Sequence, residues 1–441
     1  MRSIYNILLT LGFVLSSPFY FLKMWRRGNW RDGFRQRFGV LGTRVKVAIT
    51  NRHVLWIHAV SVGEVNLCAQ MIRALEPRVP NLKIVVSTTT STGMGELRRR
   101  LPDHILKIYY PVDLKRCVVR AVTTLHPEAV VLVEAEIWPN FLWRLRDRKT
   151  PVFLVNARLS ERSYRGYKRL GFLFRPIFAS FKGVGAQSET DRQRLIDLGC
   201  RPEAVHVFGS LKFDSARVDE RRLVDVPRML RQLGVPEGAP VVVAGSTHAG
   251  EETVLAEAFL RLRKRFPDLF LVLVPRHFER GKEVARELKA RGVRYIYRRV
   301  VTPNTHAPRG SLDCLLVNTT GELKYFYEEA SVIFVGKSLV GRGGQNPIEP
   351  GALGKPMIFG PNMQNFAAIA DSFVKGRGAI QVDGAEALER ELADLLANPG
   401  RRDELGANAL RVVKENAGAM DRTVEMIVSN LDGVDTFVAP A

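Results

Sequence analysis

Cysteine is scarce in this sequence, and the few cysteines present are far apart. The 441 residues include four, with no CxxC pair among them: Cys68, Cys117, Cys200 and Cys314. This spacing supports neither a zinc site nor a disulfide framework. We therefore expect reduced thiols, as is usual for a protein in a cytosolic setting.

Several common catalytic and nucleotide-binding motifs are also missing. The sequence has no GxSxG, no HExxH and no GxGxxG after its first strand-like segment. Gly336-Lys337-Ser338 resembles the end of a P-loop, but Ser331 stands where the required first glycine would be. No DxD pair is present to hold a metal–nucleotide complex, and the eight histidines are dispersed. We therefore expect no cofactor and no metal site.

Acidic residues are few relative to basic ones, with 45 Asp and Glu against 66 Lys and Arg and a formal charge of +21. This excess predicts anionic partners, such as nucleic acid, phosphorylated small molecules or an anionic membrane surface. A nucleic-acid interface would need a basic stripe with interleaved aromatic residues. Here the arginines are dispersed and the polar residues gather after strands, so we expect no nucleic-acid partner.

A long apolar run stands at the N-terminus. Residues 4–22 contain no charged side chain and are about long enough to span a bilayer, although Pro18 should kink or break a helix. Bulky residues at 19–21 disfavour a cleaved signal peptide. A membrane span, a helix lying in the interface and a buried core helix remain open, and the basic cluster over residues 23–37 favours membrane attachment of either kind.

Apolar strand-like runs alternate with helical patterns along most of the chain. The runs form two series: residues 54–59, 83–87, 105–110, 129–133, 152–156 and 183–186, then 241–244, 270–274, 295–297, 314–317, 332–335 and 357–359. This alternation predicts two α/β blocks, each with a mostly parallel, doubly wound sheet.

Domain boundaries follow from the same pattern. We expect a membrane anchor over residues 1–25, a first Rossmann-like domain over 26–214 and a charged linker over 215–238. A second Rossmann-like domain over 239–410 and a C-terminal helix over 411–441 would follow. The C-terminal part, residues 386–430, is mostly helical, with its clearest break at Pro399-Gly400.

The stretch from Val335 to Gly360 has the layout of a strand, a glycine-rich turn and a helix start. Glycines at 341, 343 and 344 would let the backbone approach a ligand closely. Asn346 suits a helix cap and Pro347 the first helical position. Such a helix start favours an anion such as phosphate. An ordinary strand–turn–helix unit of an α/β core fits the same pattern.

Polar residues that follow strands are the candidate site residues, because ligands of open α/β sheets bind beyond the carboxyl ends of the strands. Glu64 could be a general base or only a helix-start residue. Glu134 and Glu136 share one face and could bind a cation or substrate hydroxyls, or serve only as a cap and an ion-pair partner. Lys212 and Arg276 could contact a phosphate, or be ordinary surface residues.

Seven longer motifs occur in one order along the chain. They are WIHAVSVGE (56–64), VEAEIWPN (133–140), NARLSERS (156–163), GSLKFD (209–214), PRHFER (275–280), TGEL (320–323) and GGQNPIEP (343–350). This ordered set resembles the Kdo transferase family, which adds 3-deoxy-D-manno-oct-2-ulosonic acid (Kdo) to lipid A precursors. The resemblance covers nearly the whole chain.

The resemblance implies a GT-B glycosyltransferase fold, with two Rossmann-like lobes and a cleft between them. The first domain, residues 26–214, would bind the acceptor, and the second, residues 239–410, would bind the CMP-sugar donor. The C-terminal helix over residues 411–441 would cross back to the first domain. The resemblance implies an inverting transfer of Kdo from CMP-Kdo to a lipid A precursor, lipid IVA, in lipopolysaccharide core biosynthesis. The enzyme would be anchored by its N-terminus at the cytoplasmic face of the anionic inner membrane. A GT-B enzyme that uses a UDP-sugar on a lipid acceptor is the alternative.

The resemblance also implies roles for individual residues. Glu64 matches the family's general base, and Glu134 and Lys212 match its transition-state residues. The family's CMP-binding stretches correspond to Pro275, Arg276, Thr320, Gly321, Glu322, Asn346, Pro347, Ile348 and Glu349. The sequence departs from the family at Ser210, commonly asparagine, and at Thr320, commonly methionine. Neither change removes a charged group, so we expect the donor pocket to be tuned rather than disabled.

Overall fold

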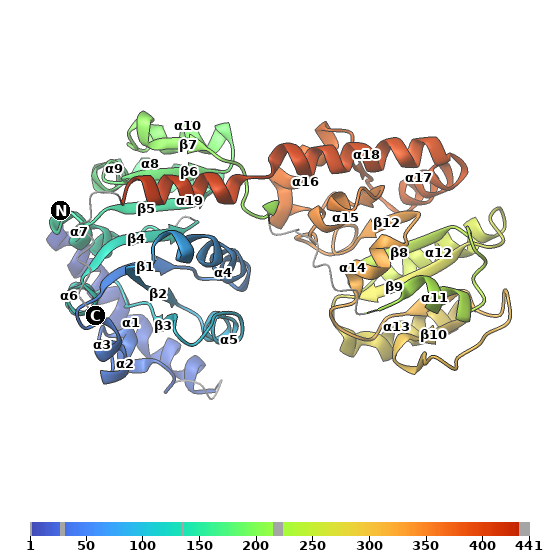
Figure 1. The fold of residues 1–441 in the computed structure, drawn as a ribbon, viewed down its shortest axis with the longest axis horizontal. Coiled ribbons are helices and arrows are strands. Elements are labelled where there is room, and N and C mark those ends of the chain that lie inside the picture. The colour runs from blue at the N-terminus through green and yellow to red at the C-terminus, as the bar shows by residue number, and fades with distance from the viewer. Residues whose placement is uncertain (1, 27–30, 135, 215–223, 432–441) are drawn as a thin grey trace. The chain divides into compact units, whose positions relative to one another are not determined.

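The computed structural model describes residues 2–26, 31–134, 136–214 and 224–431. The chain forms two compact units: unit 1 comprises Met1–Ser215 and Ala417–Ala441, and unit 2 comprises Ala216–Asn416. Each unit is built on a parallel β-sheet with helices packed against it (Figure 1). The predicted fold class, two α/β blocks with parallel sheets, is therefore confirmed.

The described part of unit 1 contains a sheet with the strand order β3-β2-β1-β4-β5-β6-β7. All its strand pairs are parallel. The strands are β1 (His53–His58), β2 (Leu82–Thr88), β3 (Leu106–Tyr109), β4 (Pro127–Val133), β5 (Val152–Ala157), β6 (Gly183–Ala186) and β7 (Val205–Val207). The sequence predicted the first six of these strands to within two residues at each end and missed β7, which has only three residues.

Side chains of β1 alternate between two cores. Val54 and Trp56 belong to the core on one face of the sheet, whereas Leu55 and Ile57 belong to the core on the other. A strand buried on both faces explains the continuous apolar run that marks it in the sequence.

The helices of unit 1 are α1 (Arg2–Arg26), α2 (Phe34–Arg37), α3 (Thr43–Ile49), α4 (Val62–Leu75), α5 (Ser91–Arg100), α6 (Lys115–Leu125), α7 (Pro139–Asp147), α8 (Glu161–Arg169), α9 (Gly171–Phe178), α10 (Glu189–Asp197) and α19 (Ala419–Ser429).

Unit 2 repeats this architecture with the strand order β10-β11-β9-β8-β12-β13-β14 among its described residues, again with parallel pairs. The strands are β8 (Val241–Thr247), β9 (Phe270–Pro275), β10 (Tyr295–Tyr297), β11 (Cys314–Leu316), β12 (Val332–Val335), β13 (Met357–Phe359) and β14 (Ile380–Gln381). The helices are α11 (Val226–Gln232), α12 (Glu251–Arg263), α13 (Gly281–Ala290), α14 (Leu323–Glu328), α15 (Ile348–Ala352), α16 (Ala367–Lys375), α17 (Ala385–Ala397) and α18 (Pro399–Asn416).

Each sheet has a central topological switch point, where the connections from two neighbouring strands lead toward opposite edges of the sheet. It lies between β1 and β4 in unit 1 and between β8 and β12 in unit 2. Ligands of open α/β sheets bind outside the carboxyl ends of the strands at such points. The loops after β1, β4, β8 and β12 are therefore the places to look for a site.

Unit boundaries differ from the predicted domains in two places. The predicted linker includes α11, which buries Val226, Met229 and Leu230 in unit 2, so the described residues from 224 onward are not a linker. The rest of the predicted linker, residues 215–223, lies outside the described residues. The predicted crossing helix over 411–441 is also wrong at its start, because α18 runs to Asn416 inside unit 2 and only α19 belongs to unit 1.

The C-terminal helix α19 completes unit 1. Its start is held by Asp214, whose carboxylate accepts hydrogen bonds from the backbone N–H groups of Gly418 (2.6 Å) and Met420 (2.7 Å). The buried side chains of α19 join the core that also contains α4, and the helix, red in Figure 1, lies along α4 and β6. The break predicted at Pro399-Gly400 lies one residue earlier, since Pro399 is the first residue of α18.

Helix α1 is continuous from Arg2 to Arg26 despite Pro18. Proline at this position cannot donate to the carbonyl of Val14, four residues earlier. The hydroxyl of Ser17 donates to that carbonyl instead, at 2.9 Å. This replacement bond explains why the expected break does not occur.

Candidate functional site

The loop after β1 leads into α4, and Glu64 lies in the first turn of this helix. Ser61 and Glu64 form a capping box: the Ser61 hydroxyl accepts the backbone N–H of Glu64, and the Glu64 carboxylate accepts that of Ser61. The same carboxylate accepts the backbone N–H of Val60 at 2.8 Å. Glu64 is 8% exposed. It is therefore both a helix cap and a nearly buried carboxylate beside the switch point, with acceptor sites left over for a substrate proton.

The end of β4 carries Glu134 and Glu136. Glu134 has a left-handed backbone (φ 61°), which is unfavourable for a residue with a side chain. Burial raises the pKa of its carboxyl, and the charge of Glu64 raises it further, whereas the positive charge of Lys212 opposes this rise. Burial likewise raises the pKa of Glu136, whose carboxylate accepts the indole N–H of Trp138 at 2.7 Å. Ala135 between them lies outside the described residues.

Lys212 lies in the loop that follows β7. Burial lowers the pKa of its ammonium group, while the negative charges of Glu134 and Glu64 raise it. The charges of Glu64 and Glu134 both act on Lys212, and Asn156 links Glu134 to the backbone next to Lys212, so the three predicted catalytic residues lie in one cluster of charges. Arg158, at the end of β5, acts on both Glu134 and Lys212. Unit 1 thus brings together carboxylates and cations at its switch point.

Asn156 connects two parts of this cluster, and the sequence indicated it only as one of the polar residues that follow strands. It is 1% exposed and has a left-handed backbone (φ 53°). Its side-chain amide donates to Glu134 at 3.5 Å, and its side-chain oxygen accepts the backbone N–H of Leu211, next to Lys212, at 3.1 Å. A polar residue at a strand end was the only signal available. Ser210, one of the departures from the family pattern, is buried in the same loop.

In unit 2, Pro275 ends β9 and is buried, whereas the next residue, Arg276, is exposed. The backbone N–H of Arg276 donates to the carbonyl of Thr247 at 3.0 Å, which fixes it beside the end of β8. Burial raises the pKa of Glu349, and the positive charges of Arg276 and Lys324 oppose this rise. Arg276 and Glu349 therefore lie near each other in unit 2.

The helix start predicted at Asn346 is present but short. The side-chain oxygen of Asn346 accepts the backbone N–H of Ile348 at 3.1 Å, and its amide donates to Glu349 at 3.2 Å. Pro347 is the cap position, and helix α15 has only five residues. Glu349 reaches solvent, yet the surrounding protein atoms raise its pKa by desolvation. So short a helix has a small macrodipole, and side chains must supply most of the positive charge for a bound anion.

The third predicted stretch, Thr320 to Glu322, follows β11. Thr320 and Gly321 are exposed, and Gly321 has a left-handed backbone (φ 83°). The Glu322 carboxylate is engaged within the protein, because it pairs with the guanidinium of Arg298 at 3.0 Å and accepts the hydroxyl of Thr319 at 2.7 Å. Any ligand contact of this stretch would therefore involve its backbone more readily than the Glu322 side chain.

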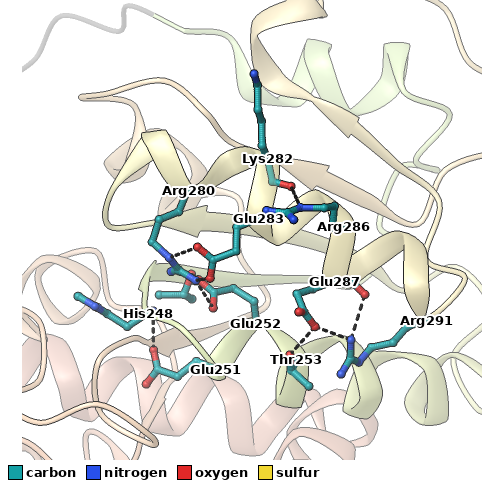
Figure 2. Close-up of polar contacts among 11 residues, drawn as sticks. His248, Glu251, Glu252, Thr253, Arg280, Lys282, Glu283, Arg286, Glu287 and Arg291 are labelled. Carbon is teal, nitrogen blue, oxygen red and sulfur yellow. Dashed lines mark hydrogen bonds and ion pairs between the residues drawn. The ribbon is translucent and has the colours of Figure 1, made fainter.

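Two buried acidic residues at the start of α12, Glu251 and Glu252, accept hydrogen bonds from the loops of unit 2 (Figure 2). Glu252 pairs with Arg280 at 2.8 Å and accepts the hydroxyl of Thr247 at 2.9 Å. Glu251 is fully buried and accepts backbone N–H groups from His248 and from the loop after β12. The sequence did not predict a role for either glutamate. Among the described residues, no group of histidine, cysteine and acidic side chains is arranged to hold a metal ion.

Helix α1 is fixed to unit 1 by its N-terminal part. Arg2 pairs with Asp147 at 2.7 Å, and the Tyr5 hydroxyl donates to Asp113 at 2.9 Å. Asn6 accepts the side-chain amide of Asn140 at 2.8 Å. The helix leaves many large apolar side chains exposed to solvent: Ile4, Ile7, Leu8, Leu11, Val14, Leu15, Phe19, Phe21, Leu22 and Trp25.

Among the described residues, no helix has both the length and the hydropathy that crossing a bilayer requires. Of the readings left open by the sequence, the buried core helix conflicts with the exposed apolar side chains of α1.

Comparison with known proteins supplies the family. The sequence model of the 3-deoxy-D-manno-octulosonic-acid transferase (kdotransferase) family matches residues 32–215. The 3-deoxy-D-manno-octulosonic acid transferase of Haemophilus influenzae is 31% identical over 433 residues, which is 98% of this chain and 99% of that protein. The transferase of the same name from Bordetella pertussis is 34% identical over 425 residues, covering 93% of this chain and 96% of that protein.

Among solved structures, the UDP-GlcNAc 2-epimerase of Neisseria meningitidis superimposes with a TM-score of 0.57 over 86% of this chain and 100% of its own, at 15% identity. That likeness shows a shared two-unit fold. The near-complete matches to the two transferases show more: this chain belongs to the 3-deoxy-D-manno-octulosonic acid transferase family and is a glycosyltransferase.

Proposed function

We propose that this GT-B enzyme transfers Kdo from CMP-Kdo to the lipid A precursor lipid IVA, with inversion at the anomeric carbon, in lipopolysaccharide core biosynthesis. The observation that carries the proposal is the charge cluster of unit 1. The charge of Glu64 acts on the pKa values of both Glu134 and Lys212 beside a switch point, in a chain whose family transfers this sugar.

The chemistry needs a base, a stabilised sugar cation and a neutralised leaving group. An acceptor hydroxyl oxygen would attack the anomeric carbon as the bond to the CMP phosphate oxygen breaks, and Glu64 would take the hydroxyl proton. General base catalysis of this kind contributes about 10²–10⁴ in rate. Glu134 and Lys212 would stabilise charge that develops in the transition state, each in a partly buried setting where electrostatic terms are strong.

Unit 2 would hold the nucleotide. The guanidinium of Arg276 would bind the phosphate, and the Glu349 carboxylate could accept hydrogen bonds from the ribose hydroxyls. Asn346 orients that carboxylate through its side-chain amide. The backbone of Thr320 and Gly321 would complete the site, with Pro275, Pro347 and Ile348 shaping it.

The membrane role follows from α1. An exposed apolar helix with basic residues at its C-terminal end suits a position in the plane of the interface, on the cytoplasmic face of the anionic inner membrane. The same surface carries the lipid acceptor. This placement would keep a water-accessible catalytic unit next to a substrate that does not leave the membrane.

A transfer assay tests the proposal directly. Purified full-length protein is incubated with freshly generated CMP-Kdo and a tetraacylated lipid A precursor, and products are read by mass spectrometry. A gain of one or more Kdo masses is the expected result, and its multiple gives the number of residues added. No gain from folded protein and intact donor contradicts the proposed donor and acceptor. Thermal stabilisation by UDP but not by CMP would then favour a UDP-sugar enzyme.

A further inference from the structure

Two polar side chains that the proposed mechanism does not use, those of His248 and Lys337, lie at the switch point of unit 2. His248 directly follows β8, and Lys337 follows β12 after one glycine; β8 and β12 are neighbouring parallel strands. Gly341 marks where they approach each other. A Cβ on Gly341 would lie 3.2 Å from Lys337 Cγ and 3.9 Å from His248 Cβ. Both side chains therefore start from one small area of the surface.

Glu251 fixes the two loops that carry these side chains. Its fully buried carboxylate accepts four backbone N–H groups: those of His248 (2.9 Å), Lys337 (2.7 Å), Ser338 (2.8 Å) and Leu339 (2.9 Å). Figure 2 shows the bond to His248. A single buried carboxylate that joins the ends of two strands across a switch point holds both loops in one arrangement.

Lys337 has a strained backbone in this arrangement. Its φ of 57° lies in the left-handed region, where a residue with a side chain is less stable than glycine. The strain is held by Glu251 and by the hydrogen bond from Gly344 N to the Lys337 carbonyl at 2.9 Å. Strained conformations that a rigid surrounding enforces cluster at binding and catalytic sites.

Cationic groups lie around the two side chains. One of these groups, Arg280, is paired with both Glu252 and Glu283, at 2.8 Å each. His248 packs edge-to-face with His277 at 5.7 Å between ring centroids, and Lys337 and Arg280 also place positive charge near it. Two acidic groups lie nearby, and both are engaged: Glu251 by backbone N–H groups and Glu252 by Arg280. Within the described part of the chain, the Lys337 ammonium makes no ion pair or side-chain hydrogen bond that would neutralise it.

We propose that Lys337 and His248 form an anion-binding subsite that takes an acidic group of the nucleotide-sugar donor, either its phosphate or the carboxylate of its sugar acid. The proposal rests on the proposed function, since it assumes CMP-Kdo as the donor. Lys337 supplies a point charge and His248 a hydrogen bond. The short helix α15 contributes little positive charge of its own, so a cation from the neighbouring loop would supply the charge that a bound anion requires.

The test uses a substitution that separates binding from stability. Lys337→Gly removes the ammonium group and also relieves the left-handed strain, so the protein should become more stable while binding becomes weaker. Lys149→Gly is the matched control, because Lys149 has the same left-handed backbone (φ 58°) and is exposed in unit 1. Thermal unfolding, calorimetric titration with CMP and with cytidine, and the KM for CMP-Kdo are measured on the full-length protein.

The results distinguish the two sources of the anion. If the subsite takes the phosphate, Lys337→Gly weakens CMP binding about 10- to 100-fold and leaves cytidine binding unchanged. If it takes the carboxylate, CMP binding is unchanged and the KM for CMP-Kdo rises by a similar factor. His248→Asn should act on the same ligand to a smaller extent.

Unchanged CMP affinity and unchanged KM in Lys337→Gly, with stability raised as in Lys149→Gly, would overturn the subsite while leaving the proposed function in place. Wild-type protein that neither binds CMP nor uses CMP-Kdo would instead overturn the proposed function itself.

Discussion

At the scale of single residues, left-handed backbone conformations mark both switch points. Glu134 and Asn156 adopt them at the ends of β4 and β5, and Ser246 and Lys337 adopt them at β8 and β12. None of these residues is glycine, so each conformation has an energetic cost that the surrounding hydrogen bonds must offset. These four strained residues thus lie beside the strand ends where ligands of α/β sheets bind.

Asn156 offers a test of the unit 1 cluster. Asn156→Gly keeps the left-handed backbone without strain but loses both side-chain bonds, so kcat should fall about tenfold while CMP affinity stays unchanged. Asn156→Asp keeps the acceptor for Leu211 but places a second negative charge beside Glu134. That charge raises the pKa of Glu134, so the acid limb of the pH–kcat profile should move to higher pH.

A matched control for Asn156 is Asn51, which has the same left-handed backbone (φ 54°) and is exposed. Asn51→Gly and Asn51→Asp should leave kcat and the pH profile unaltered. A fall in stability without any change in kcat or in the acid limb for the Asn156 variants would limit Asn156 to a structural role.

Glu64 has two functions that substitution can separate. Glu64→Gln retains a side chain that completes a capping box, so α4 should keep its stability, while the proton acceptor is lost. We expect kcat to fall about 10²–10⁴-fold with CMP affinity unchanged. Ser61→Ala is the complementary variant, because it weakens the cap by about 1 kcal/mol and leaves the carboxylate. Substantial turnover by Glu64→Gln would remove Glu64 from the base role.

The sequence identified the charged residues of the site more readily than the residues that position them. Glu64, Glu134 and Lys212 stand at strand ends within recognisable motifs. The contact of Asn156 with Glu134 and Leu211 depends instead on how β4, β5 and the loop after β7 lie in register. The bonds from Glu251 to residues 337–339 likewise connect segments far apart in the chain. Sequence spacing alone carries no information on such contacts.

At the scale of elements, strand prediction succeeded where burial on both faces makes long apolar runs, as in β1 and β4. It missed β7 and β14, which have three and two residues and pair at the sheet edges. Pro18 misled the prediction for α1, because the compensating bond from the Ser17 hydroxyl to Val14 depends on a rotamer that the sequence does not specify.

Helix α1 should bind membranes through its exposed apolar side chains. Leu8→Glu combined with Leu15→Glu places charge on that surface, at positions 64% and 81% exposed, so unfolding temperature should stay unchanged. Sedimentation with vesicles containing anionic lipid should fall by at least about tenfold, since burying each leucine is worth about 1.5–3 kcal/mol. Thr10→Glu, an exposed polar position on the same helix, is the control.

The double variant has an advantage over deletion of residues 1–25. Deletion would also remove the contacts of Arg2, Tyr5 and Asn6 with unit 1, and would confuse loss of membrane binding with loss of stability. If the double variant sediments as well as wild type, the basic surface alone is sufficient for membrane binding.

At the scale of the whole molecule, each unit has its own core, so a core substitution should destabilise one unit only. Ile427→Ala in α19 should lower the unfolding free energy of unit 1 by about 2–5 kcal/mol, and Leu388→Ala in α17 should do the same to unit 2. Scanning calorimetry with and without CMP assigns the transitions, because CMP should raise only that of unit 2. A shift of both transitions by Ile427→Ala would show that the units unfold together.

The position of α19 has a consequence for synthesis. Unit 1 begins at the N-terminus, but its last helix is encoded after the roughly 200 residues of unit 2. At about 5–20 residues per second, the ribosome takes roughly 10–40 s to translate unit 2. During that time the apolar surface of α4 that receives Met420 and Ile427 has no cover. The nascent chain therefore presents a chaperone with a binding surface that disappears only once α19 has been synthesised.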